Sequence, residues 1–383
     1  MHLRLLTRPE EFAALRGDWD TLRRSARERS VFATHDWFDA ALAWQGDDTA
    51  PYILCCERDG ALAGVLPLAL RRAAGRGIGQ RVLEFLAVPD TQRCDALIAD
   101  ESPDVAAALA GELHRRRGQW DALRLRYLAA DSTTATLFAP ALAACGIRCH
   151  DAEGAANPWI ALDGDWSTFY ATRSRRLKKQ LNLAANRLGK LGAVGIEWLN
   201  ASPFDLDDAL ARITEISARS WKATTGNSLD NRGPQAFLRA IAKHRVDEGG
   251  VSIWILSLDG RAVAMEFQLI DDGNIYALRS DFDESLGHAS PGSHLSRQML
   301  ERLFGRGLSR YYMGPGHNAY KHRWTDTLEP ARALTAYAPT GRGRLLAAWE
   351  TSVKPAARRV VARFRRAPAE AADDGADDTE KAR

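Results

Sequence analysis

The sequence predicts an α/β protein that consists of two similar domains in tandem, each with a mixed sheet. Three observations support this fold class. The chain has 383 residues, more than one hydrophobic core usually serves. Its composition, with 45% hydrophobic and 26% charged residues, is typical of a folded chain. A segment around residue 59 also resembles one around residue 259, so the two halves look like copies of one unit.

Each of these two segments reads as a β-hairpin. Residues 52–68 and 251–267 are pairs of apolar runs around Asp-Gly, at 59–60 and 259–260. Asp-Gly favours a tight turn because Gly accepts positive φ and Asp tolerates it. A helical pattern begins 22 residues before each Asp, at Trp37 and at Phe237. Duplication of one α/β unit explains this similarity; chance likeness of two hairpins is the alternative.

The remaining elements follow the same order in both halves. In the second half we expect a strand at 274–280, a helix at 294–304 that ends at Gly305 and Gly307, and a strand at 309–313. In the first half the matching elements are a strand at 81–88, a helix at 104–117 and a strand at 122–128. Gly154 and Pro158 mark a boundary, so the predicted domains are residues 1–152 and 153–340.

Two strongly basic segments accompany these domains. The pattern of residues 165–190 predicts a basic amphipathic helix capped by Asp165 or Ser167. Its basic face has three interpretations: it is simply solvated, it attracts an anionic substrate to the rim of a site, or it contacts nucleic acid. Residues 341–366 predict a second basic helix, which rests on an anionic membrane surface or docks on the protein. The Ala- and Asp-rich tail, 367–383, is predicted to be disordered.

Charge and cysteine content restrict the function classes. The formal net charge of +3 gives the whole chain no attraction to nucleic acid or anionic lipid. The five cysteines are scattered without metal-ligand spacing, so we expect free thiols in a reducing compartment and no bound metal. Charge comes too early in the first eleven residues for a signal peptide, which predicts a cytoplasmic location.

Two loops in the second half carry the candidate chemistry. The small-residue turn at 290–292 precedes a helix, whose free N–H groups and dipole suit a pyrophosphate; an ordinary capped helix start is the alternative. The loop at 314–324 follows a strand and brings together glycines, His, Tyr, Lys, Arg and Trp, as in ligand-binding loops. Its alternative reading is packing by the aromatic residues, with Lys321 in water.

These residues make the sequence resemble the Gcn5-related N-acetyltransferases (GNAT). Within this family it is most similar to the tandem-domain branch, which includes FemAB-like peptidyltransferases and CelD/BcsL-type proteins of cellulose and exopolysaccharide biosynthesis. The matching residues are Trp37, the helix start at 174–177, the turn at 290–292 with Leu295, and Gly314 and Gly316 leading to Tyr320 and Lys321. The segment 287–292 has fewer glycines than the usual pyrophosphate loop, and residues 311–314 lack the acid often found there.

The resemblance implies two GNAT-like domains, acetyl-CoA or another acyl-CoA as the donor, and transfer to an amine or hydroxyl. The donor-binding candidates are Ser290, Gly292, Ser293 and Arg297, and the substrate-binding candidates are His317, Asp281 and Arg176. Tyr320 is the candidate acid for the leaving thiolate, and Lys321 is the candidate group that fixes the substrate.

Glu266 is the candidate general base. Alternation along its strand places Ala264, Glu266 and Gln268 on one face among apolar neighbours, where desolvation raises a carboxyl pKa. An edge-strand Glu facing water is the alternative. We therefore predict an acyltransferase whose acceptor is a sugar or cell-envelope precursor, with nucleic acid not expected as a partner. A FemAB-like transferase that uses aminoacyl-tRNA and a catalytically silent binding module are the alternatives.

Overall fold

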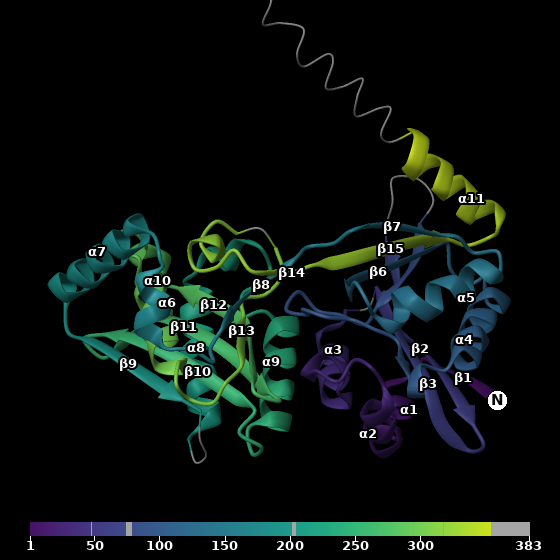
Figure 1. The fold of residues 1–383 in the computed structure, drawn as a ribbon, viewed down its shortest axis with the longest axis horizontal. Coiled ribbons are helices and arrows are strands. Elements are labelled where there is room, and N and C mark those ends of the chain that lie inside the picture. The colour runs from purple at the N-terminus through teal and green to yellow at the C-terminus, as the bar shows by residue number, and fades with distance from the viewer. Residues whose placement is uncertain (47, 74–78, 201–203, 317, 354–383) are drawn as a thin grey trace, which may run out of the picture.

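The computed structural model describes residues 1–46, 48–73, 79–200, 204–316 and 318–353, and it contains two mixed sheets (Figure 1). The first sheet, on the right in Figure 1, comprises β1 (His2–Leu6), β2 (Thr49–Arg58), β3 (Ala61–Ala73), β4 (Gln80–Phe85), β5 (Leu97–Ile98), β6 (Ala122–Ala129), β7 (Cys149–Glu153) and β15 (Ala331–Tyr337). The second sheet, on the left, comprises β8 (Asn157–Ala161), β9 (Val194–Leu199), β10 (Val251–Leu258), β11 (Arg261–Asp271), β12 (Asn274–Phe282), β13 (Arg310–Tyr312) and β14 (Leu328–Glu329).

Helices cover both sheets. In the first half these are α1 (Pro9–Ala13), α2 (Arg16–Ser25), α3 (His35–Trp44), α4 (Pro103–Arg115) and α5 (Ala139–Ala144). In the second half they are α6 (Trp166–Ala171), α7 (Arg175–Leu191), α8 (Leu206–Ala218), α9 (Arg232–Arg245), α10 (Pro291–Leu303) and α11 (Gly341–Ala348). Across the residues that the structure describes, every helix is too short or too polar to span a bilayer.

Both predicted hairpins are confirmed. Asp59 and Gly60 join β2 to β3, and Asp259 and Gly260 join β10 to β11, all four with positive φ. Each hairpin also has a register shift at the same distance from its turn, after Cys56 in one and after Leu256 in the other. A shared irregularity of this kind supports duplication of one unit, because chance hairpins have no reason to repeat it.

The two sheets have the same strand order, and the first sheet takes one strand, β15, from the second half of the chain. The first sheet runs β1-β2-β3-β4-β6-β15-β7, and the second runs β9-β10-β11-β12-β13-β8-β14. Strand β8, at the start of the second half, lies between β13 and β14, whereas β15, near the end of that half, lies between β6 and β7. In Figure 1, β15 crosses to the first sheet. A cut between residues 152 and 153 therefore separates β15 from the sheet to which it belongs.

The halves also meet through the helices that precede the hairpins. Helices α3 and α9 lie side by side between the sheets (Figure 1). The rings of Trp37 and Phe237, at equivalent positions in the repeat, have centroids 5.1 Å apart. Buried residues from both halves form one continuous core around this contact. The two halves are thus packed as one body, which fixes any site that lies between them.

The basic segments differ from their predicted extents. Residues 165–190 form two helices, because Ser174 adopts an extended conformation and its side chain caps α7 by accepting a hydrogen bond from the N–H of Leu177. Asp165 caps α6, as expected. Helix α11 ends at Ala348 in a wider turn, Trp349–Val353. The remainder of the predicted basic helix and the acidic tail lie outside the described residues.

Candidate active site

A cavity of about 470 Å³ opens where two strands of the second sheet diverge. Strand β13 pairs with β12 in parallel only between residues 274–276 and 310–312. Strand β12 then continues to Phe282, while the chain after β13 turns away through Gly314, which has a φ of 82°. The cavity occupies this gap and is lined by residues of α7, α10, β11, β12 and the loops at 89–92, 221–222 and 313–324.

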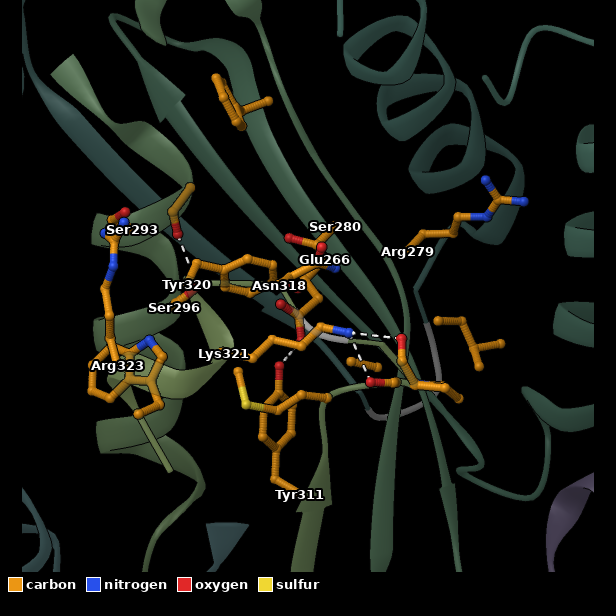
Figure 2. A pocket seen from close by; sticks show the side chains of 18 of the residues that line it. Glu266, Arg279, Ser280, Ser293, Ser296, Tyr311, Asn318, Tyr320, Lys321 and Arg323 are labelled. Atoms are coloured by element: carbon orange, nitrogen blue, oxygen red, sulfur yellow. Dashed lines mark hydrogen bonds between the residues drawn. The ribbon is translucent and has the colours of Figure 1, made fainter. Parts of the chain in front are cut away.

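The cavity reaches both faces of the sheet. Ser280 is the register partner of Glu266, so their side chains point to the same face, which α10 covers. Arg279 is the partner of Phe267 and points to the opposite face, towards the first half. Figure 2 shows Arg279 directed away from the other labelled residues. Because Arg279 and Ser280 both line the cavity, its wall includes residues from both faces of the sheet. We call the part lined from the α10 face and the part lined from the opposite face its two chambers.

Glu266 lies at the centre of the cavity wall and is only 4% exposed. Its strand, β11, lies between β10 and β12, so the edge-strand alternative is wrong. The Tyr311 hydroxyl donates to Oε1 at 2.6 Å, and Gln268 Nε2 donates to the same oxygen at 2.7 Å (Figure 2). Burial raises the pKa of the Glu266 carboxyl to about 6, against the opposing effect of these two hydrogen bonds. That pKa suits a general base near neutral pH.

Lys321 is a second buried charge in the same cavity. Its Nζ donates to the carbonyl oxygens of Gly314, at 2.7 Å, and of Pro315, at 3.2 Å (Figure 2). Burial lowers the pKa of Lys321 to about 8, although the carboxylate of Glu266 opposes this shift. The alternative reading, with Lys321 in water, is therefore wrong. Its ammonium group holds the 314–315 turn against the cavity.

Tyr320 stands beside Lys321 and is 44% exposed. It also lines the cavity, and in Figure 2 its ring lies on the same side as Ser293 and Ser296 of α10. Desolvation of the phenol and the nearby charge of Glu266 raise the pKa of Tyr320. A phenol in this state keeps its proton at neutral pH, so it is able to protonate a leaving group.

The start of α10 forms one end of the cavity. Ser290 adopts a left-handed conformation, with a φ of 55°, and Pro291 is the first helical residue. The helix geometry leaves the N–H groups of Gly292 and Ser293 without intrahelical partners, and the helix dipole makes this end attractive to anions. Gly292 and Ser293 line the cavity, with apolar walls from Leu177, Leu181 and Phe282. This is a suitable place for a phosphate-bearing donor.

Of the candidate catalytic, donor-binding and substrate-binding residues, five line this cavity: Gly292, Ser293, Glu266, Tyr320 and Lys321. The remaining described candidates have other surroundings. Ser290 lies just before α10, the Arg297 guanidinium lies over the Tyr170 ring at 5.6 Å, and Arg176 is exposed on α7. Asp281 is buried and holds Lys222 Nζ at 2.6 Å. His317 lies outside the described residues.

Sequence reasoning missed several residues of the wall. Tyr311 is in a predicted strand, but nothing in the sequence shows that its hydroxyl reaches Glu266. Asp90 comes from the first half, 189 positions before its partner Arg279, to which it is joined by a hydrogen bond of 2.7 Å. Trp221 and Lys222 lie in a short 3-10 turn, Trp221–Thr224. Long-range packing brings all of these together, and no local pattern predicts it.

The described residues show no set of side chains arranged as metal ligands. Within the described ranges, no three His, Cys, Asp or Glu side chains gather in an arrangement that holds a metal ion. The five cysteines are free thiols in the structure, three of them buried. The polar groups in the cavity are instead those of acid–base chemistry and anion binding.

Comparison with known proteins agrees with this geometry. Residues 175–322 match the sequence family described as an acetyltransferase (GNAT) domain. Among solved structures, FemX aligns at 11% identity with a TM-score of 0.54, over 88% of this chain and 97% of FemX. A Bacteroides thetaiotaomicron protein described as conserved and of unknown function aligns at 11% identity with a TM-score of 0.54, over 87% of this chain and 100% of its own.

A tandem GNAT protein from the clavulanic acid biosynthesis pathway aligns at 13% identity with a TM-score of 0.48, over 89% of this chain and 100% of its own. Curated protein sequences gave no match. The predicted fold, a mixed α/β architecture with GNAT-like domains, is confirmed. The matched residues include Glu266, Gly292 and Lys321, so the candidate site lies largely within the stretch that is similar to the acetyltransferase (GNAT) domain family.

Proposed function

We propose that this protein is an acyl-CoA-dependent acyltransferase, with acetyl-CoA as the first donor to test, and that it acylates an amine or hydroxyl of a polysaccharide or cell-envelope precursor, as CelD/BcsL-type proteins are expected to do. One observation carries the proposal. A single cavity crosses the second sheet and joins the open start of α10 to the buried carboxylate of Glu266.

The donor belongs in the chamber on the α10 side. Its pyrophosphate accepts hydrogen bonds from the N–H groups of Gly292 and Ser293, and its acyl arm runs between Leu177, Leu181 and Phe282 towards Glu266. Beyond Tyr276 the edge of β12 has left β13, so its N–H groups are available to the carbonyl oxygen of the thioester. These donors stabilise the negative charge that develops on that oxygen during transfer.

The proton transfers follow from the two hydrogen bonds on Glu266. Both go to Oε1, so Oε2 is the oxygen that takes the proton of the acceptor amine or hydroxyl. The acceptor then attacks the thioester carbonyl, the new amide or ester bond forms, and the carbon–sulfur bond breaks. Tyr320 donates its proton to the departing thiolate and recovers one from water, while Glu266 releases its proton to solvent.

Donor binding is tested by titration calorimetry with acetyl-CoA and CoA. A Cβ at Gly292 would lie 3.4 Å from Phe282 Cδ1, so the indole of Gly292→Trp has to occupy the donor chamber. We expect micromolar binding that this variant weakens at least about a hundredfold, as expected when the phosphate contacts are lost. Gly118→Trp, in an exposed turn of the first half where an added Cβ meets nothing within 4 Å, is the matched control and should bind like the parent. Equal affinity of both variants for acetyl-CoA would show that the donor does not bind in this chamber.

An aminoacyl-tRNA donor is the second candidate, and helix α7 is the observation that favours it. Arg175, Arg176 and Lys179 are exposed on α7, while Leu177 of the same helix lines the cavity. A tRNA bound along this face would place its aminoacylated end near Glu266. Replacing the three basic residues with glutamine should then weaken tRNA binding and flatten its salt dependence. Binding of acetyl-CoA with no salt-dependent tRNA binding would discard this candidate, and absence of both would favour a silent binding module.

A further inference from the structure

The chamber on the side of the first half has its own chemistry. Its described walls include Pro89, Asp90, Arg279 and the short turn with Trp221 and Lys222. Trp221 is 55% exposed, a large apolar surface in contact with the cavity. Lys222 Nζ also lies 3.4 Å from the carbonyl oxygen of Ser280, the register partner of Glu266. Glu266 lines the same cavity from the opposite face of the sheet, so a group held in this chamber reaches the candidate base through the gap beside β12.

The turn that presents Trp221 is held firmly. Ser217 donates to Asp281 at 2.8 Å, Arg219 to Asp283 at 3.0 Å, and Lys222 pairs with Asp281 at 2.6 Å. All three contacts fasten the turn to β12 and the residue that follows it. The indole is thus a preorganised surface, and an exposed ring that costs little entropy to use is typical of a binding platform.

The charges in this chamber are already paired. Lys222 pairs with Asp281, and Arg279 pairs with Asp90 through Nε, so the four groups carry no net charge, while Arg279 Nη2 is buried without a hydrogen-bond partner. An acceptor that binds through its own charge would need an unpaired partner. The paired groups still offer hydrogen-bond donors and acceptors, next to an apolar ring. A neutral ring with hydroxyl groups at its edge and C–H bonds on its face complements this combination.

We propose that this chamber binds the acceptor and that a neutral hexopyranose ring stacks on Trp221, with its hydroxyl groups bonded to Asp90 and Lys222. The proposal deepens the function proposed above, since it names the acceptor class of the same site. It makes Trp221 a specificity-determining residue that acts on the acceptor and not on the donor. A phosphorylated sugar is not favoured here, because each cation of this set already has a carboxylate partner.

The test is saturation-transfer NMR titration of the whole protein with methyl glucoside, glucosamine and glucose 6-phosphate, each with and without bound CoA. Trp221→Ala should weaken methyl glucoside binding about tenfold, and Trp221→Phe should retain most of it, as expected for loss and retention of an aromatic face. Trp349→Ala is the matched control, because Trp349 is also 53% exposed but does not line the cavity. Donor affinity, measured separately, should not change in Trp221→Ala.

Three results would overturn the inference. The first is binding of methyl glucoside that Trp221→Ala does not weaken, and the second is no binding of it with or without CoA. The third is glucose 6-phosphate binding more than tenfold tighter than the neutral glucoside, which would show a cation in the chamber that is available to the phosphate. If the protein binds the glucoside through Trp221 but does not bind acetyl-CoA, the acceptor chamber stands and the proposed donor fails. The two proposals are therefore separable.

Discussion

Glu266→Gln is expected to lower the turnover number by about a hundredfold or more while leaving acetyl-CoA affinity close to that of the parent, because a general base contributes a factor of this size. The amide is nearly isosteric and its oxygen still accepts the bond from the Tyr311 hydroxyl. The substitution therefore removes the proton acceptor and little else. Steady-state kinetics with an acceptor found by screening, together with calorimetry for the donor, measure the two effects separately.

The pH dependence provides a second readout of the same residue. Glu266 must be ionised to act as a base, so kcat/KM of the parent should rise with pH through about 6, the raised pKa of this carboxyl. The Gln variant should lack this rise in its residual activity. An unchanged acidic limb in Glu266→Gln would assign the titration to another group, and turnover within threefold of the parent would remove Glu266 from the chemistry.

The same substitution should stabilise the fold above pH 6. The carboxyl pKa is about 6 in the folded chain and 4.5 when unfolded, so the folded state holds more protons between these values. Stability is therefore lost as pH rises through this window, and the loss persists at pH 8. Removing the buried charge should recover on the order of 1–2 kcal/mol at pH 8 and almost nothing at pH 4. Denaturant unfolding at the two pH values measures the difference.

Local patterns were sufficient to predict the hairpins and the position of Glu266. The Asp-Gly turns require positive φ, which few residues accept, and the alternation at 264–268 placed Glu266 and Gln268 on one face, as the bond between their side chains confirms. The chamber on the α10 side was predictable from the sequence for the same reason. A turn of small residues before an amphipathic helix predicts an open helix start wherever that helix packs.

The second chamber was not predictable in this way. Asp90 and Arg279 come from different halves, and the pair forms only because β12 faces the first half at that point. Trp221 carries no local signal that it borders a cavity, since a single Trp between polar residues is also typical of ordinary packing. The break at Ser174 was missed because the basic and apolar residues on either side continue one helical pattern, and the cap wins over that pattern.

Residues 1–152, expressed alone, are expected not to fold, although the sequence suggests that they form a complete domain. Strands β6 and β7 are not paired with each other, because β15 lies between them with Leu334 and Ala336 in the core of the first sheet. Without β15 both strands expose unpaired backbone groups and apolar side chains. The fragment also loses Phe237, against which Trp37 packs. Circular dichroism should show no cooperative thermal transition.

Complementation distinguishes a missing strand from a chain that cannot fold for other reasons. Co-expression with residues 153–383 returns β15 and Phe237 to the fragment, so the two pieces should co-purify and unfold together. A partner piece of residues 153–330 keeps Phe237 but lacks β15, and it should fail to rescue. A sharp, reversible transition of residues 1–152 alone would show that β4, β6 and their helices suffice. Rescue by the shorter piece would place the missing stability in the contact between α3 and α9 and not in the exchanged strand.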